Sequence, residues 1–246
     1  MSYVLAVSGK GGTGKTTVSA LLSRLIISRG KGSLLAVDAD PNDNLAAAFG
    51  VKAERTIGDI IGAVAKNPES VPKGMSKERF LEYEVQSAVQ ECEGLDLLTM
   101  GRPEGPGCYC YVNNILRGVL AKLAADYDFV VIDNEAGLEH LSRKTAGRIN
   151  LLLTVADATA AGMKAARRVA CLADELSLKV DRKTLLVNKC RPCDVPAPED
   201  IGPGMEFLGY LPFDMKVAEA GINGTSLLDL RDGSAALEAL EAMEIV

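Results

Sequence analysis

One glycine-rich run near the start of the chain restricts the possible folds more than any other feature. An apolar stretch at residues 4–7 leads into Gly9-Lys10-Gly11-Gly12-Thr13-Gly14-Lys15-Thr16-Thr17, and a segment with helical periodicity follows at once. The run fits the pattern G-x-x-x-x-G-K-[ST] in the strand–loop–helix setting that the pattern requires. Glycines let backbone N–H groups converge on phosphate oxygens, and the N-terminus of the next helix adds partial positive charge. The sequence therefore predicts a phosphate-binding loop rather than an ordinary glycine-rich turn.

The two lysines of this loop have different expected roles. Lys15 should neutralise the β- and γ-phosphate oxygens of a nucleotide, and the Thr16 hydroxyl should ligate Mg²⁺. Lys10 follows the first glycine of the motif and has no evident task within its own subunit. A solvated loop lysine is the plain alternative for it.

Short apolar runs alternate with helical segments over nearly the whole chain. We expect strands at residues 4–7, 33–37, 95–99, 129–132, 151–155, 184–187 and 207–211, and helices at 15–29, 56–66, 77–91, 112–125, 160–176 and 234–243. This alternation predicts an α/β fold with a doubly wound, mostly parallel sheet that binds ligands at the carboxyl ends of its strands. No repeat, low-complexity tract or long linker divides the sequence, so we expect one domain over residues 1–246.

Acidic residues at the ends of two expected strands suit a cation beside the phosphates. Asp38 and Asp40 follow the strand at 33–37, and Asp133 follows the strand at 129–132. Carboxylates in such places can hold Mg²⁺ through water and orient an attacking water molecule. Asp133 fits the Walker B arrangement, in which an apolar strand delivers one aspartate to the phosphate loop. For Asp38 and Asp40, a simple strand-end turn is the alternative.

Thiols greatly outnumber imidazoles, with six cysteines against the single histidine, His140. Any soft-metal site on one subunit would therefore consist mostly of thiolates. Cys108 and Cys110 would point the same way if their segment is extended. Two such thiolates half-fill a four-coordinate site, and a two-fold dimer would complete it for Zn²⁺ or Ni²⁺. Taken alone, the C-x-C pair is more simply two buried thiols or a chance match.

The other cysteines and the histidine carry weaker expectations. Cys190 and Cys193 form a C-x-x-C in a proline-rich stretch, whereas a redox pair would be expected to open a helix. Cys92 and Cys171 fall on expected helical segments and are most simply core or surface thiols. The position of His140 favours a structural or signalling part over a metal ligand.

Charge and hydropathy argue against several classes of partner. The net charge of −6 disfavours non-specific binding to nucleic acid or anionic membranes. The sequence holds no apolar stretch of transmembrane length and no basic, signal-like start, so we expect a cytoplasmic protein with reduced cysteines. The expected last helix pairs an apolar stripe with glutamates, which favours packing on the domain over membrane attachment.

The run from Lys10 to Thr17 resembles that of the deviant Walker A ATPases, the group of MinD, ParA and the nitrogenase iron protein. The resemblance extends over essentially the whole chain. It implies that Lys10 reaches the partner's phosphates in a nucleotide-sandwich dimer and that Asp40 positions the attacking water, with Asp38 in the outer shell of the metal. It also implies that Gly137 offers a backbone N–H to the γ-phosphate. Asn188 matches the position that contacts the base, and Arg191 breaks the guanine-reading pattern, so adenine is expected.

Cys108-Tyr109-Cys110 together with Gly137-Leu138-Glu139-His140-Leu141 resembles the CooC-type ATPases, which assist nickel insertion into carbon monoxide dehydrogenase. Close relatives that serve acetyl-CoA synthase share the pattern, so the client stays open between the two. The resemblance implies a homodimer that binds ATP, ADP and Mg²⁺, and a Ni²⁺ or Zn²⁺ site that Cys108 and Cys110 share across the dimer.

Two other functions fit the same family. An iron–sulfur electron-transfer protein would need a cysteine in the second switch segment, and residues 133–141 contain none. A positioning or partition ATPase of the MinD/ParA type would bind a lipid or DNA surface, which the charge disfavours.

Overall fold

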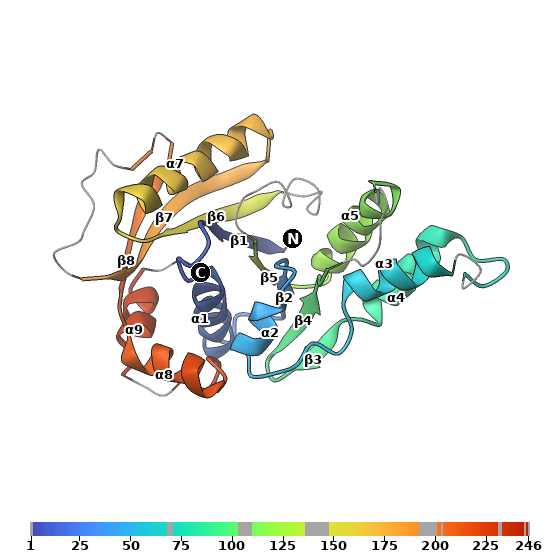
Figure 1. Cartoon of the computed structure of the whole chain (residues 1–246), viewed down its shortest axis with the longest axis horizontal. Coiled ribbons are helices and arrows are strands. Elements are labelled where there is room, and N and C mark those ends of the chain that lie inside the picture. The colour runs from blue at the N-terminus through green and yellow to red at the C-terminus, as the bar shows by residue number, and fades with distance from the viewer. Residues whose placement is uncertain are drawn as a thin grey trace.

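The computed structural model describes residues 2–67, 71–102, 110–135, 148–191, 201–202, 204–230, 233–243 and 245, with the side chains of 65 and 110–117 left out. Its sheet has eight strands in the order β3-β4-β2-β5-β1-β6-β7-β8 (Figure 1). The strands are β1 (Tyr3–Gly9), β2 (Leu34–Asp38), β3 (Gln90–Cys92), β4 (Leu95–Thr99), β5 (Phe129–Asp133), β6 (Ile149–Ala156), β7 (Val180–Cys190) and β8 (Glu206–Pro212). The helices are α1 (Lys15–Ser28), α2 (Asn44–Ala48), α3 (Ile57–Lys66), α4 (Lys77–Gln86), α5 (Cys110–Ala125), α7 (Ala160–Glu175), α8 (Met215–Asn223) and α9 (Ala235–Glu241).

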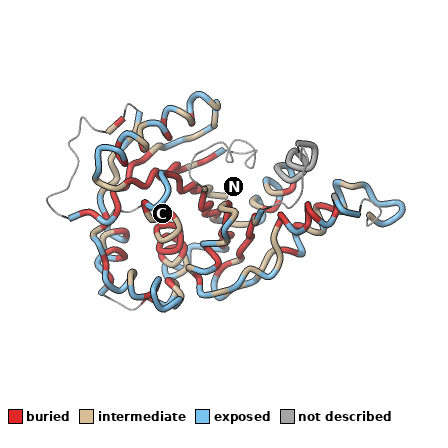
Figure 2. The backbone as a smooth tube through the Cα atoms, viewed as in Figure 1, coloured by how far each residue is buried: buried red, intermediate tan, exposed pale blue. Residues whose placement is uncertain are grey.

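Both faces of the sheet are covered by helices, as its apolar strands require. Along β1, Leu5 and Val7 belong to the core cluster beneath α1, α2 and α9, whereas Ala6 belongs to a cluster beneath α7. Alternate residues of β2 likewise divide between the α1 face and the face covered by α3, α4 and α5. The central strands are buried (Figure 2). Parallel strands that are buried on both faces have continuous apolar sequences, which is why these strands could be predicted from the sequence.

The register of the central strands aligns their carboxyl ends. β1 pairs in parallel with β5 and β6, and β2 pairs in parallel with β4 and β5. Asp133 lies opposite Val7 on one side and opposite Asp38 on the other. The start of the glycine-rich loop and two carboxylates therefore meet at one edge of the sheet.

The predicted α/β fold with a mostly parallel sheet is confirmed, since β3–β4 is the one antiparallel pairing among the described strands. The helix expected over 77–91 is wrong at its end: α4 stops at Gln86, and Gln90–Cys92 forms a strand. A two-residue turn joins that strand to β4, and Gly94 adopts the positive φ of +80° that this turn needs. Helices α2 and α8 were not predicted, and each is short, with five and nine residues.

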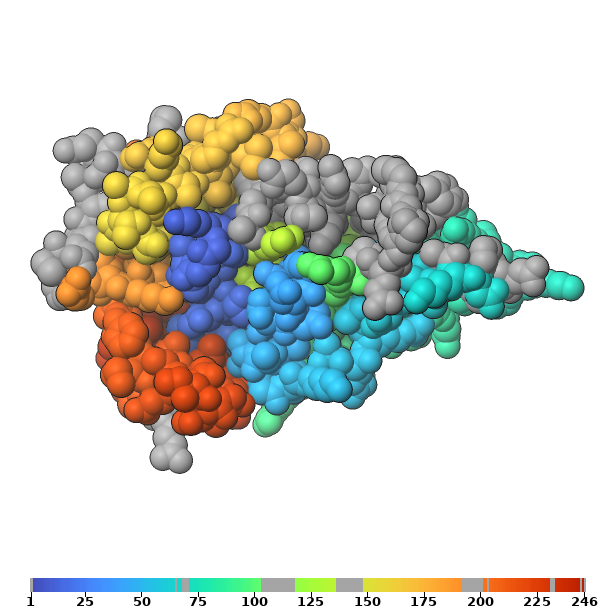
Figure 3. Space-filling model, in the orientation of Figure 1, coloured from blue at the N-terminus to red at the C-terminus, as the bar shows by residue number. Residues whose placement is uncertain are grey.

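The acidic C-terminal helix packs on the domain, as expected. Leu237 and Leu240 of α9 are buried in the cluster that also holds α1. In Figure 3 the orange and red C-terminal residues lie beside the light-blue segment that follows β2, and the Leu227 N–H donates to the Ala48 carbonyl at 2.9 Å. Within the described part of the chain, no helix has the length and apolar character needed to cross a bilayer.

Asp214 joins the two C-terminal helices through one buried carboxylate. Its Oδ1 accepts from the Lys216 N–H at 2.8 Å at the start of α8, and its Oδ2 accepts from the Ser234 hydroxyl and the Ala236 N–H at 2.6 and 3.0 Å. Burial acts to raise the pKa of Asp214, but these hydrogen bonds outweigh it and leave the pKa below its ordinary value. The charged carboxylate therefore stabilises the fold more than its protonated form does.

Replacing this carboxylate should loosen both helices. We expect Asp214→Ala to lower the free energy of unfolding at pH 7 by about 2–4 kcal/mol, because it removes the N-cap of α8 and the acceptor for the Ser234 hydroxyl and the Ala236 N–H at the start of α9. The difference should shrink as the pH falls below about 4, where the unfolded chain no longer favours the charged form. Urea titrations at several pH values measure it. Asp229→Ala, an exposed change in the same segment, should stay within about 0.5 kcal/mol of wild type, and equal effects of the two variants would contradict this role.

Candidate functional site

The glycine-rich loop takes a conformation that two of its glycines make possible. A Cβ on Gly9, whose φ is +147°, would lie 2.1 Å from the Val155 carbonyl oxygen. A Cβ on Gly14, whose φ is +92°, would lie 2.3 Å from the Asn188 amide nitrogen. Both positions thus combine a positive φ with a close approach from strands β6 and β7, which only glycine tolerates.

Hydrogen bonds within the loop hold its shape, and the loop leads into a helix whose first turn has no side-chain cap. The Lys10 carbonyl accepts from the Thr13 hydroxyl at 2.9 Å and from the Lys15 ammonium at 3.4 Å. α1 begins at Lys15 with Gly14 as its N-cap, and no described side chain caps it. The free N–H groups of that first turn can therefore bind an anion.

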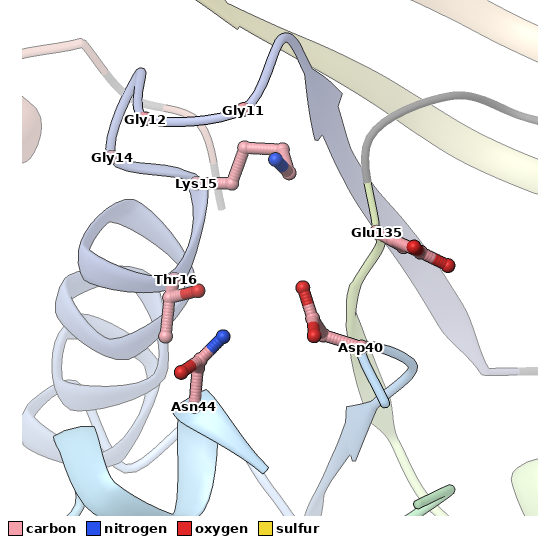
Figure 4. A pocket seen from close by; sticks show the side chains of 8 residues that line it. All are labelled: Gly11, Gly12, Gly14, Lys15, Thr16, Asp40, Asn44 and Glu135. Atoms are coloured by element: carbon pink, nitrogen blue, oxygen red, sulfur yellow. The ribbon is translucent and has the colours of Figure 1, made fainter. Parts of the chain in front are cut away.

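A cavity of about 400 Å³ lies in front of this loop (Figure 4). It is lined by Gly11, Gly12, Gly14, Lys15, Thr16, Asp40, Asn44 and Glu135. In Figure 4, Lys15 and Asp40 point into the same space from α1 and from the segment after β2. Thr16 and Asn44 face it from α1 and α2, so cationic, hydroxyl, amide and carboxylate groups share one opening.

Two buried carboxylates, Asp133 and Asp38, lie close to the residues that line the cavity. Asp133 is 1% exposed; its Oδ1 accepts from the Ser19 hydroxyl at 3.1 Å, and its Oδ2 has no hydrogen-bond partner among the described residues. Burial raises the pKa of Asp133 to about 6, although the Thr16 and Ser19 hydroxyls and the Lys15 charge oppose the shift. An orphaned carboxylate oxygen beside the Thr16 hydroxyl suits a hard, oxygen-seeking cation such as Mg²⁺.

Asp38 is the second of these carboxylates. Burial raises its pKa to about 7, with a further upward push from the charge of Asp133. Its Oδ2 accepts from the Leu45 N–H at 2.7 Å and its Oδ1 from the Asp40 N–H at 3.2 Å. Asp38 thus fixes both the segment that carries Asp40 and the start of α2. A dication held near both carboxylates would favour their charged forms.

Asp40 is held by its own loop in an orientation towards the cavity. Its Oδ1 accepts from the Asn42 N–H at 2.9 Å and from the Asn42 side-chain amide at 2.7 Å. Its carboxylate therefore lies at the cavity with one oxygen already occupied, as a group that orients a water molecule would need.

Asn188 contacts the loop rather than standing apart from it. Its side-chain Nδ2 donates to the Thr13 carbonyl at 2.9 Å, and the residue is 7% exposed. A base-contacting role for Asn188 stays a prediction, but its place beside the loop is compatible with one. Lys10, by contrast, is exposed and makes no side-chain hydrogen bond or ion pair to the described residues.

Sequence comparison places this site in a known family. A family model described as the CobQ/CobB/MinD/ParA nucleotide-binding domain matches residues 4–227. The chain belongs to this MinD/ParA family. An uncharacterised ATP-binding protein of Methanocaldococcus jannaschii is 41% identical over 97% of this chain and 95% of its own. The carbon monoxide dehydrogenase accessory protein CooC of Rhodospirillum rubrum is 34% identical over 96% of this chain and 94% of its own.

Solved structures agree on the fold. The septum site-determining protein MinD of Pyrococcus horikoshii, complexed with Mg-ADP, superposes with a TM-score of 0.71 at 22% identity, covering 99% of this chain and 94% of that one. At this identity the likeness shows the MinD-like P-loop fold alone.

Several predicted residues of this MinD/ParA family member fall outside the described residues: Cys108, Gly137, His140 and Cys193. Cys110 begins helix α5, so the condition of an extended C-x-C segment is not met at that residue, and the alternation of side chains along a strand does not apply to the pair. Among the described residues, no group of three or more His, Cys, Asp and Glu could hold a metal ion. Cys92, Cys171 and Cys190 form no disulfide within the described part of the chain, and Cys190 is the buried last residue of β7.

The sequence missed two residues that line the cavity. Asn44 and Glu135 follow β2 and β5 by six and two positions, respectively. Proximity to the ends of β2 and β5 was the available signal, because every strand end at this edge points towards the ligand side.

The close approach of Gly14 to β7 gives a direct test of the loop geometry. Gly14→Ala should lower the free energy of unfolding by at least about 2 kcal/mol and weaken nucleotide binding, because its Cβ would overlap Asn188 at a positive φ. Gly11→Ala is the matched control for stability, since a Cβ there meets nothing within 4 Å. Urea unfolding of the nucleotide-free proteins measures both, and a Gly14→Ala protein as stable as Gly11→Ala would refute the geometry.

Proposed function

We propose that this protein is a Mg²⁺-dependent ATPase that dimerises with nucleotide and assists nickel insertion into carbon monoxide dehydrogenase or acetyl-CoA synthase. The observation that carries the proposal is the 34% identity to a carbon monoxide dehydrogenase accessory protein over nearly the whole of both chains. A site with phosphate-binding geometry and a C-x-C pair supports it.

The nucleotide half of the proposal follows from the groups around the cavity. Lys15 and the open first turn of α1 bind the β- and γ-phosphates, and Thr16 binds the metal directly. Asp133 and Asp38 hold the metal through water, which agrees with their burial and raised pKa values. Mg²⁺, when bound there, offsets negative charge on the phosphate oxygens. Adenine is the expected base, with Asn188 beside it.

Hydrolysis needs a water molecule aligned with the γ-phosphate and compensation of the charge that develops there. Asp40 orients that water, because its carboxylate faces the cavity opposite Lys15 (Figure 4). Lys10 of each subunit reaches the partner's phosphates in the closed dimer. Its exposure and lack of a described side-chain partner support this role. Gly137 adds a backbone donor to the γ-phosphate.

The metal half of the proposal rests on the cysteine pair. Cys108 and Cys110 from two subunits supply four thiolates for Ni²⁺ or Zn²⁺, which is cargo for the client enzyme. Closure or hydrolysis reshapes this shared site and releases the metal. An iron–sulfur electron-transfer protein is the alternative function, and an anaerobic visible spectrum with cluster absorbance would favour it.

The fold alone also suits a surface-binding positioning ATPase of the MinD/ParA type. The buried stripe of α9, Leu237 and Leu240, is committed to the core, which argues against lipid attachment through this helix. Co-sedimentation of the ATP-bound protein with anionic vesicles or DNA tests that alternative, and binding to either would favour it over the metallochaperone.

Removing the two thiols should abolish metal binding. We expect Cys108→Ser/Cys110→Ser to lose the one Ni²⁺ or Zn²⁺ bound per dimer, with affinity falling by about 100-fold or more, since the thiolates are the ligands. Equilibrium dialysis with and without ATP measures the stoichiometry. Cys92→Ser/Cys171→Ser is the matched control, because it removes two thiols outside the proposed site. Unchanged metal affinity in the first variant would exclude the C-x-C site.

Loss of Lys10 should affect the dimer and not the monomer. Lys10→Ala is expected to lower ATP turnover by about tenfold or more and to weaken nucleotide-dependent dimerisation, because the charge supplied across the interface is gone. ADP affinity of the monomer should stay within about twofold. Phosphate release and sedimentation velocity measure these quantities, with Lys31→Ala as the exposed-lysine control. Normal turnover in Lys10→Ala would remove the cross-subunit role.

A further inference from the structure

A bulge interrupts strand β7 at the point where it meets the phosphate loop. Val187 pairs with Tyr210 of β8 and Cys190 pairs with Pro212, so β7 uses three steps where β8 uses two. The extra residue falls at Asn188–Lys189, and Lys189 has a φ of +56°. This left-handed conformation is unfavourable for a lysine, and bulges that re-aim side chains are frequent next to functional sites.

The bulge lets two successive side chains reach the same target. In a regular strand, neighbouring residues point to opposite faces of the sheet. Here Asn188 Nδ2 donates to the Thr13 carbonyl at 2.9 Å, and Lys189 Nζ donates to the Gly12 carbonyl at 3.2 Å. The Lys189 N–H also donates to Asn188 Oδ1 at 2.9 Å, which holds the amide in this orientation.

We propose that Lys189 is a positioning residue for the phosphate loop, acting with Asn188 to set which way the loop's peptide groups point. The carbonyl and the N–H of a trans peptide point in opposite directions. Donors on the β7 side therefore turn the N–H groups of Thr13 and Gly14 towards the inside of the loop, where phosphate oxygens would lie. This inference rests on the nucleotide binding of the proposed function and adds a residue that couples the base side of the site to the phosphate side.

The conformation of Lys189 supports this role over that of a solvated surface lysine. A lysine that only faced water would gain nothing from a left-handed backbone, for which glycine is the favoured residue. The Lys189 stem also passes 3.8 Å from the position of a Cβ on Gly14, so the side chain lies along the loop rather than away from it.

Three variants separate positioning from simple structure. Lys189→Met keeps the stem but removes the donor, and should weaken Mg-ADP binding by about five- to tenfold, the effect of one hydrogen bond. Hydrogen–deuterium exchange of residues 10–17 in the nucleotide-free protein should rise, and Lys189→Arg should restore both quantities. Lys189→Gly should also weaken Mg-ADP binding while leaving the unfolding midpoint in urea equal or higher, because it relieves the backbone strain.

Ser177 offers a matched control, since it has a φ of +52° at the end of α7, away from the loop. Ser177→Gly relieves the same strain and should leave Mg-ADP affinity unchanged. Lys189→Met with unchanged exchange, or with raised exchange and unchanged affinity, would overturn the positioning role. If wild type fails to bind Mg-ADP, the proposed function fails. Faster hydrogen–deuterium exchange of residues 10–17 in Lys189→Met would then still support the contact between Lys189 and the loop.

Discussion

Val7, Asp133 and Asp38 lie in one row across three parallel strands, and the rest of the site depends on that alignment. The loop leaves β1 two residues later, so backbone donors and Lys15 face carboxylates that were buried by the same sheet. Burial removes the carboxylates from solvent and thereby raises the pKa values of Asp38 and Asp133. A dication between the carboxylates and a phosphate would offset the cost of burying the two charges. Metal binding would therefore be coupled to the ionisation of Asp38 and Asp133.

Asp38 of this row also holds the segment that carries Asp40, the residue expected to orient water. Asp38 accepts from the N–H groups of Asp40 and Leu45, so it anchors the segment between β2 and α2 at both ends. Asn42 then holds the Asp40 carboxylate, and Asn44 faces the cavity from the first turn of α2. A change in the charge of Asp38 therefore alters the hydrogen bonds that hold the segment carrying Asp40, the residue expected to orient water.

Local sequence patterns predicted much of the fold because buried parallel strands carry continuous apolar runs. Leu95–Thr99 was predicted to the residue, and the other long strands differ only at their ends. The patterns failed where length was short or a turn intervened: the helix expected to reach residue 91 ends at Gln86, because Gly94 turns the chain into a hairpin. Helix α5 begins at Cys110, two residues before the predicted start, so the condition of an extended C-x-C segment is not met at that residue.

The sequence by itself determined the parts of the site that are contiguous: the phosphate loop and the strand-end carboxylates. Their chemistry depends on residue type and local backbone, which a motif encodes. Only the tertiary structure decided that β7 lies beside the loop, with Asn188 bonded to Thr13 across 175 positions and Lys189 to Gly12 across 177. Strand order and a one-residue bulge set those contacts, and no local periodicity specifies either, because both arise from long-range pairing within the sheet.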